Sequence, residues 1–593
     1  MPVASARRTA RLSLAAGLAS ALAFALSFPL SDTFVGGWPL AFAWPALLSA
    51  AVWAAPRPST LAWTVGAPFF AAFLAHEWWM RHITELGMPV LVLYLSGWTV
   101  LLALLLRRLA VGADGSARWP FALALPCALV AVEYMRGSFV CSGYAWFFAA
   151  HPVTEWTEVA QIASLGGGWL LTALVGFVAG AAVDAVVRSG RGRRDGNPDG
   201  TPDGNPDGSP SGIPARRIIW PTLAVAALAG SWGFGRAQIA AHDAAADSSS
   251  STGAAARPRI LVVQTNLPMS NKLAWPPEQQ VEDFLVFARQ TIDGARAARE
   301  QGGGVDLALW PETMVPGLGL EPESLRTLVE GGYYPGNRFE EALRDLATRI
   351  DAPLLVGSPS FLGLSVEGNR FRWTSQFNSA YLVGPDGARG RTDKIYLTPF
   401  GEMMPIISNW DWLEAQLLAL GAEGMTFDLD AAREPQAFRV DTPSGAIGVA
   451  VPICFEITQP WAARRIAFPD GARAAGVVVN LSNDGWFGGS RAGRRQHLQV
   501  SQLRAIELGT PVVRCVNTGL SASIDAVGRL EAVLGPEVDG AFVASPVPGK
   551  GRPLAVLVGD GVAVVACLAA LVGLFRARRA VMATGDLAAM LVP

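Results

Sequence analysis

The chain has 593 residues, too many for one ordinary domain, so we expect at least two. Only 16% of the residues are charged and the mean hydropathy is +0.31, which favours a membrane protein, while a net charge of −2 argues against nucleic acid as a partner. The 5 cysteines are scattered and form no CxxC pair, so neither a zinc site nor a disulfide framework is indicated.

Hydrophobic segments long enough to cross a bilayer predict about eight transmembrane helices. They lie at about 12–30, 38–54, 61–79, 89–106, 119–135, 159–187, 218–234 and 554–575. Arg7, Arg8 and Arg11 precede the first segment, as in a signal peptide, but no small-residue cleavage site follows. We therefore interpret this segment as a retained anchor.

Arginines gather in every second loop between these segments. With the N-terminus in the cytoplasm, the inner loops hold Arg57, Arg107, Arg108, Arg118, Arg188, Arg191, Arg193, Arg194, Arg216 and Arg217, and the tail holds Arg576, Arg578 and Arg579. The short outer loops hold few, chiefly Arg81 and Arg136. Because arginine is enriched on the cytoplasmic side, both termini should be cytoplasmic and the large segment before the last helix should face outward.

Composition changes divide the chain into a membrane domain at 1–240, a linker at 241–256, an outer domain at 257–548, and a final helix with a cytoplasmic tail at 549–593. The repeats of Pro-Asp-Gly at 190–214 predict a disordered cytoplasmic loop, with Ca²⁺ binding by its aspartates as the lesser alternative. The linker is rich in alanine and serine, and we expect a flexible tether.

Four ionisable side chains fall at the outer ends of predicted spans. His76 and Glu77 end the third span, Glu133 and Arg136 end the fifth, and an aromatic loop at 143–148 follows. They could form an interfacial belt with snorkelling ends, or they could line a mouth through which lipid reaches the outer domain.

The outer domain alternates short β-runs with helical stretches. The β-runs lie at 259–264, 305–310, 353–357, 379–383, 446–451, 476–481 and 511–516, and the helical stretches at about 278–301, 338–350 and 496–508. This alternation predicts a layered α/β domain. Cys515 lies on an apolar run, so we expect a buried structural thiol there.

Three β-runs lead into residues that could carry acyl-transfer chemistry. Glu312 follows the run at 305–310, Lys394 follows the run at 379–383, and Cys454 follows the run at 446–451. A cysteine can attack a carbonyl, a carboxylate can move the protons, and an ammonium can stabilise the oxyanion while lowering the thiol pKa. Taken singly, Glu312 could cap a turn, Lys394 could form a surface ion pair, and Cys454 could be a buried hydrophobe.

The motifs around these residues carry a resemblance to a known family. WPE at 310–312, DKIYLTPFGE at 393–402 and PICFE at 452–456 resemble the Glu-Lys-Cys motifs of the nitrilase (carbon–nitrogen hydrolase) superfamily. The run NLSNDGWFGGSRAGRRQHLQVSQLRAIELGTPVVRCVNTG at 480–519, with the span layout, resembles the bacterial apolipoprotein N-acyltransferases. The resemblance implies an α-β-β-α nitrilase-like sandwich set on a polytopic membrane bundle.

The resemblance also implies roles for individual residues. Cys454 would be the nucleophile, Glu312 the general base and acid, and Lys394 the oxyanion stabiliser. Glu402 matches a second glutamate that supports the site, and Glu456 matches the acidic residue just after the nucleophile.

Three aromatic residues complete these expectations. Trp275 falls where the family has a tryptophan on a mobile loop near the lipid, and Trp146 lies in the outer aromatic loop; we expect both to contact substrate. Phe455 stands where many members have tyrosine, which puts a hydroxyl contact in doubt.

The implied reaction is a ping-pong acyl transfer without metal or cofactor. The sn-1 acyl chain of a phospholipid would pass through a Cys454 thioester to the α-amine of the diacylglyceryl cysteine of an apolipoprotein. We expect a monomer in the inner membrane with its catalytic domain on the periplasmic face. The alternatives are a membrane-anchored amidase that hydrolyses small amides and, less favoured by the intact residues, a non-enzymatic transporter or scaffold.

Overall fold

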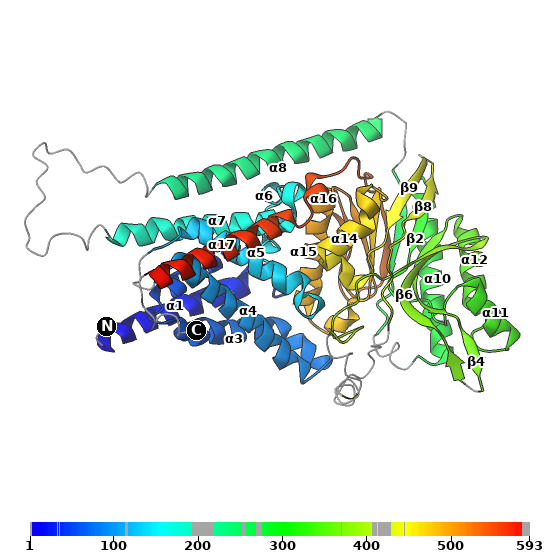
Figure 1. Ribbon diagram of the computed structural model, residues 1–593. Helices are drawn as coiled ribbons and strands as arrows, with labels where there is room; N and C mark the ends of the chain where they lie inside the picture. The colour runs from blue at the N-terminus through cyan, green and yellow to red at the C-terminus, as the bar shows by residue number, and fades with distance from the viewer. Residues whose placement is uncertain are drawn as a thin grey trace, which may run out of the picture.

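A computed structural model places a bundle of long helices at one end of the molecule and an α/β domain at the other (Figure 1). The structure describes residues 3–31, 34, 36–112, 117–191, 218–251, 257–268, 275–368, 370–405, 412, 429–443 and 445–583. Most of the loop expected at 190–214, from residue 192 onward, lies outside these ranges.

Six helical segments within the described residues are long and apolar enough to cross a membrane. They run at Ala6–Ser27, Pro58–His82, Gly87–Ala110, Phe121–Ser138, Ala163–Val186 and Gly561–Arg579. The shorter apolar helix α2 (Leu40–Ala54) and the long helix α8 (Ile219–Ser251) cover the positions of the other two expected spans. The predicted eight spans are therefore an approximate count.

Two membrane-domain segments differ from the expectation. The sixth expected span is not one helix, because α6 (Thr157–Ala160) is separate and α7 (Ala163–Arg191) is broken at Gly166 and Gly167, the latter with φ of 70°. The tether expected from residue 241 is wrong as far as Ser251, because α8 continues through it. Alanine, the strongest helix former, recurs there and offsets the weak propensity of the serines.

The α/β domain contains two six-stranded sheets in its described part. The first has the order β14-β1-β2-β3-β6-β7 and comprises Gly540–Ala544, Ile260–Gln264, Leu307–Leu309, Leu354–Leu362, Ser375–Gly384 and Gly387–Asp393. The second has the order β13-β12-β11-β10-β9-β8 and comprises Leu530–Leu534, Ser521–Ile524, Val512–Val516, Val477–Ser482, Gly445–Ala450 and Phe438–Thr442. Strands β1, β2 and β3 run parallel, as do β9, β10 and β11.

The sheets face each other and helices cover their outer faces. Apolar side chains from both sheets form the core between them, among them Val262, Leu309, Val479 and Val513. Helices α10 (Pro277–Glu300) and α12 (Arg338–Ile350) pack on the first sheet, and α14 (Pro460–Ala467) and α15 (Arg491–Leu508) pack on the second. The expected α-β-β-α sandwich is confirmed. A helix α11 (Pro322–Glu330), a hairpin of β4 (Ser365–Glu367) and β5 (Arg370–Arg372), and a short α16 (Leu554–Val558) complete it.

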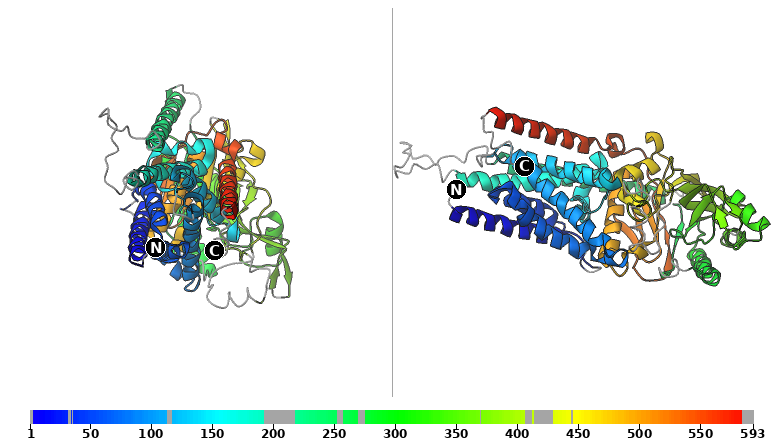
Figure 2. Two further views of the ribbon diagram at one scale, coloured as in Figure 1. Left: turned by 60° about the vertical axis from the view of Figure 1, so that its left-hand side comes forward. Right: turned by 60° about the horizontal axis from the view of Figure 1, so that its bottom comes forward.

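Helix α15 lies between the second sheet and the membrane bundle, where it packs on α7 (Figures 1 and 2). The junction is held by hydrogen bonds between polar side chains and the opposite half. They join Gln496 to His76 (3.4 Å), Gln499 to Glu155 (3.1 Å), Gln161 to the carbonyl of Val527 (2.8 Å), Gln459 to that of Gly137 (2.7 Å) and Tyr396 to that of Gly143 (2.7 Å). The two halves are therefore fixed by directional contacts.

Candidate active site

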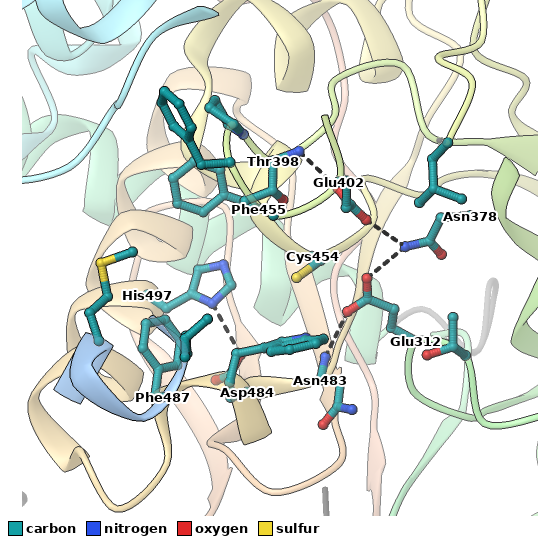
Figure 3. Close-up of a pocket in the computed structure, with 18 of the residues that line it drawn as sticks. Glu312, Asn378, Thr398, Glu402, Cys454, Phe455, Asn483, Asp484, Phe487 and His497 are labelled. Atoms are coloured by element: carbon teal, nitrogen blue, oxygen red, sulfur yellow. Dashed lines mark hydrogen bonds and ion pairs between the residues drawn. The ribbon is translucent and has the colours of Figure 1, made fainter. Parts of the chain in front are cut away.

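Strand ends deliver the three predicted catalytic residues to one place. Glu312 lies just beyond β2, Lys394 directly follows β7, and Cys454 opens the short 3₁₀ helix Cys454–Thr458 after β9. Cys454 has φ of 54°, a left-handed conformation that is uncommon for a residue with a side chain and that turns the chain sharply at the thiol. Figure 3 shows the Cys454 sulfur beside the Glu312 carboxylate.

Glu312, Glu402 and Lys394 form a buried charged cluster with Asn378. Lys394 is 0% exposed, and its Nζ lies 2.6 Å from Glu402 Oε2 and 3.9 Å from Glu312 Oε1. The Asn378 amide donates to both carboxylates, at 2.8 Å to Glu312 and 3.1 Å to Glu402 (Figure 3). The backbone N–H of Asn483 donates to Glu312 Oε2 at 2.9 Å. Both carboxylate oxygens of Glu312 are therefore held by hydrogen bonds.

Burial raises the pKa of the Cys454 thiol well above its ordinary value, and the Glu312 carboxylate raises it further; the Lys394 ammonium opposes both. The expected lowering of the thiol pKa by the ammonium is present, but burial outweighs it. Burial also raises the pKa of Glu312. The carboxylates outweigh burial at Lys394 and raise its pKa, so its positive charge persists. The raised pKa keeps the resting thiol protonated, so an attack by Cys454 would need a base, and the adjacent Glu312 carboxylate is placed to be that base.

Glu456 ties together the two segments that carry Lys394 and Cys454. Its Oε1 accepts hydrogen bonds from the backbone N–H groups of Ile395 (2.6 Å) and Tyr396 (2.9 Å), and its Oε2 accepts one from Ile453 (2.7 Å). Burial raises the pKa of Glu456 to about 7. Its bonds run to backbone that adjoins Lys394 and Cys454, so it positions both.

A cavity of about 320 Å³ opens beside Cys454 between the two halves of the molecule. We call one side of it the aromatic wall, formed by Trp79, Tyr144, Trp146, Phe455 and Phe487. Trp146 is 3% exposed and stacks on Phe455 at 5.8 Å and on Phe487 at 6.1 Å between ring centroids. Trp79, Tyr144 and Trp146 belong to the membrane domain, so the cavity requires both halves.

Of the two tryptophans predicted to contact substrate, one lines the cavity and the other does not. Trp146 lines the cavity, whereas Trp275 is not among the described residues that do; its indole donates to Asp283 of α10 at 2.9 Å. A lipid contact by Trp275 stays a prediction. Phe455 stacks on Tyr144, Trp146 and Tyr396.

The ionisable residues at the ends of the spans lie behind the cavity. Glu77 accepts a hydrogen bond from the Tyr144 hydroxyl at 2.8 Å, and Arg136 donates to the carbonyls of Tyr144 (3.3 Å) and Phe147 (3.5 Å). Glu133 accepts from the N–H of Ala149 at 2.8 Å. They are buried and hold the aromatic loop in place, which is neither of the roles expected from the sequence. Cys515 is buried on β11, as expected.

Sequence reasoning missed several polar residues at the site. Asn378 bridges the two carboxylates from inside β6, and Asn483, Asp484, His497 and Arg514 form a second polar group beside Cys454. The positions of two of these residues in the sequence could have indicated their place at the site. Asn483 and Asp484 follow β10, so they leave the sheet at the same edge as Cys454.

Known protein families match both halves of the chain. The family model described as Carbon-nitrogen hydrolase matches residues 262–545. The model described as Apolipoprotein N-acyltransferase N-terminal domain matches residues 17–181. The first match covers both sheets almost entirely, and the second covers most of the membrane bundle before α8.

Curated relatives resemble the chain over most of its length. A protein of Bradyrhizobium diazoefficiens is 30% identical over 519 residues, which is 85% of this chain and 80% of that protein. One of Geobacter metallireducens is 27% identical, covering 78% and 75%, and one of Azotobacter vinelandii is 29% identical, covering 83% and 82%. All three carry the name apolipoprotein N-acyltransferase.

Proposed function

Because the chain belongs to the apolipoprotein N-acyltransferase family, we propose that it moves an acyl chain from a phospholipid to an apolipoprotein through a thioester on Cys454. The protein is an acyltransferase with a carbon–nitrogen hydrolase domain and several membrane helices. The acceptor group would be the α-amine of an N-terminal cysteine that already carries a diacylglyceryl group.

The observation that carries this proposal is the shared cavity. Cys454, Glu312 and Glu402 line it from the catalytic domain, and Trp79, Tyr144 and Trp146 line it from the membrane domain. A site that served only small soluble substrates would not need a wall from the membrane bundle. An acyl chain drawn from the bilayer would find an apolar, mainly aromatic surface next to the nucleophile.

In the first half-reaction the Cys454 thiol attacks the sn-1 ester carbonyl and passes its proton to Glu312. The Lys394 ammonium stabilises the oxyanion that forms. Glu312 then returns the proton to the leaving glycerol oxygen, which releases a lysophospholipid and leaves the acyl group on sulfur. Glu402 and Asn378 keep Lys394 and Glu312 in place during this exchange.

In the second half-reaction the acceptor amine attacks the thioester carbonyl. Glu312 takes a proton from the nitrogen, and the tetrahedral intermediate collapses to an amide. The departing Cys454 thiolate recovers that proton from Glu312, so the enzyme ends in its starting state.

The arginine distribution supports an orientation with cytoplasmic termini and a catalytic domain on the periplasmic face of the inner membrane. Both substrates would then lie in the outer leaflet of that membrane. We further propose that the protein acts as a monomer.

Mass spectrometry of the purified protein tests the acyl-enzyme. Mixing with phospholipid should add one acyl chain to Cys454 and release a lysophospholipid, and Cys454→Ser should form no thioester while still folding in the membrane. An adduct that forms from small amides and never from phospholipid would favour the amidase instead. An adduct on any other residue would contradict the assignment of the nucleophile.

A further inference from the structure

His497 of α15 occupies the wall of the catalytic cavity and has one free ring nitrogen. The side chain is 1% exposed, lines the cavity, and contacts the rings of both Trp146 and Phe487. Its Nε2 has no hydrogen-bond partner among the described residues. A buried histidine in a core is normally satisfied at both nitrogens, so a free one in a substrate cavity calls for a partner that the substrate brings.

The other ring nitrogen is held by charged neighbours. His497 Nδ1 lies 3.2 Å from Asp484 Oδ1 and 3.0 Å from Arg514 Nη2, and the same Nη2 donates to Asp484 Oδ2 at 2.7 Å. Although burial opposes it, Arg514 and His497 keep the pKa of Asp484 far below its ordinary value, so the carboxylate is charged. Asp484 can accept from a protonated Nδ1, whereas Arg514 can only donate to a bare Nδ1, so the two partners favour opposite tautomers. The tautomer bonded to Asp484 carries its proton on Nδ1 and has the Nε2 lone pair facing the cavity, and this is the tautomer that the proposal below uses.

The same group of residues is tied to the nucleophile. Arg514 Nη1 donates to Asn480 Oδ1 at 2.7 Å, and the Asn480 amide donates to the carbonyls of Pro452 (2.9 Å) and Cys454 (3.2 Å). In Figure 3 the Cys454 sulfur lies between the Glu312 carboxylate and the His497 ring. In that view the imidazole and the Glu312 carboxylate lie on opposite sides of the thiol.

In the second half-reaction the acceptor must lose two protons, and Glu312 accepts only one of them. An α-amine has a pKa of about 7.7–8.0 and reaches the site largely as an ammonium at neutral pH. It must lose one proton to become a nucleophile and a second as the amide forms. Glu312 takes only the second, which it returns to the Cys454 thiolate.

We propose that His497 takes the first proton from the acceptor α-ammonium through Nε2 and so prepares the amine to attack the thioester. The proposal rests on the proposed acyltransferase function. An N–H bond of the ammonium breaks, a bond from Nε2 to hydrogen forms, and the imidazolium then releases the proton to water. Glu312 remains the base for the donor half-reaction, in which no ammonium takes part.

The surroundings of the ring suit a temporary proton carrier. Burial and the Arg514 guanidinium lower the pKa of His497, while Asp484 and the backbone of Cys454 act in the opposite direction. Glu312 lies across the cavity, and Trp146 and Phe487 present uncharged faces. The imidazole therefore starts neutral and cannot keep the proton, and burial of the ammonium lowers the pKa of that group as well.

Two variants of the full-length protein separate this role from others. His497→Asn can keep a hydrogen bond to Asp484 but removes Nε2. His497→Gln places an amide near the Nε2 position, which can bind the amine but cannot carry its proton. The donor half-reaction is measured as lysophospholipid release with the Cys454 adduct, and the acceptor half as decay of that adduct when a synthetic peptide with an N-terminal diacylglyceryl cysteine is added.

We expect both variants still to form the adduct, which shows that they fold, and any slowing of adduct formation should be much smaller than the slowing of transfer to the peptide. Transfer to the peptide should slow by up to about tenfold at pH 7, because only roughly one amine in ten is unprotonated there without a base. It should recover by about tenfold per pH unit up to the amine pKa, because solution then removes the proton. His497→Gln should lower kcat while the KM for the peptide changes less than about threefold.

Other outcomes overturn the inference. Equal losses in both half-reactions would make His497 a positioning residue only, and a loss confined to the donor half would mean that Nε2 carries a proton and donates it to the ester. Unchanged transfer would show that the ring has no part in it. Absence of any adduct in the unaltered protein would instead overturn the proposed function, and the inference with it.

Discussion

The charged cluster and the aromatic wall both reach Cys454, but they are held by different forces. Lys394, Glu402, Glu312 and Asn378 come from the catalytic domain alone and are joined by short, directional bonds in a buried setting. The aromatic wall combines both domains through ring stacking, which depends on shape and tolerates some change. On the proposed mechanism the cluster carries out the bond-making step, and the wall selects the donor.

Lys394→Met should have the largest effect, because it removes the only cation among these charges. Glu402 and Glu312 would be left as buried carboxylates without their counterion, at a cost of about 3–5 kcal/mol in the free energy of unfolding. The oxyanion would also lose its partner, so acylation of Cys454 should fall by at least about 10³-fold for every donor. Thermal unfolding and the rate of adduct formation measure the two effects.

The matched control for that variant adds Glu402→Gln, which restores the charge balance. The double variant should recover part of the lost stability without recovering acylation. If activity returned along with stability, Lys394 would serve the fold and not the oxyanion.

Trp146→Leu should have an intermediate effect that depends on the donor. Losing the stacks on Phe455 and Phe487 changes the aromatic wall but leaves the charged cluster intact. Acylation by phospholipid should slow by about tenfold, as expected for a loss of roughly 1.4 kcal/mol of binding. Acylation by a short water-soluble ester should keep its rate. Equal slowing with both donors would show that the wall also positions Cys454.

Phe455→Tyr should have the smallest effect. The ring stacks on Tyr144, Trp146 and Tyr396 through its faces, and an added hydroxyl leaves those stacks in place. We expect activity within about twofold of the unaltered protein, the range of substitutions that break no buried contact. A larger gain, measured with phospholipid, would mean that the absent hydroxyl has a partner on the substrate.

Strand ends made the catalytic residues predictable from the sequence. Glu312 and Lys394 follow strands of the first sheet and Cys454 follows a strand of the second, and the packing of the two sheets face to face brings these strand ends together. The helix expected at 338–350 is confirmed at both ends, because its apolar period is strong and Asp351 leaves it in the left-handed conformation.

Residues whose role depends on what packs on them were not predictable. Asn378 lies inside β6, and only the pairing of β6 with β3 sets it near Glu312. Helix α15 carries glutamines, arginines and His497, a composition typical of an exposed helix, yet the sheet and the membrane bundle bury it. The net rise of the Cys454 pKa could not be foreseen for the same reason, since it comes from burial, which outweighs the nearby ammonium.

The hydrogen-bonded junction beneath α15 determines what surface the catalytic domain would expose if it were separated from the membrane helices. Gln496, Gln499 and Gln459 make contacts there that water can replace at little cost. A catalytic domain severed from its helices would expose these glutamines together with Leu503 and Ile506 of α15, which pack in the apolar core of the membrane bundle, so its surface would be prone to association. Its cysteine would still stand beside Glu312, but it would face solvent where Trp79 and Trp146 had been, a nucleophile with no means of recognising a lipid.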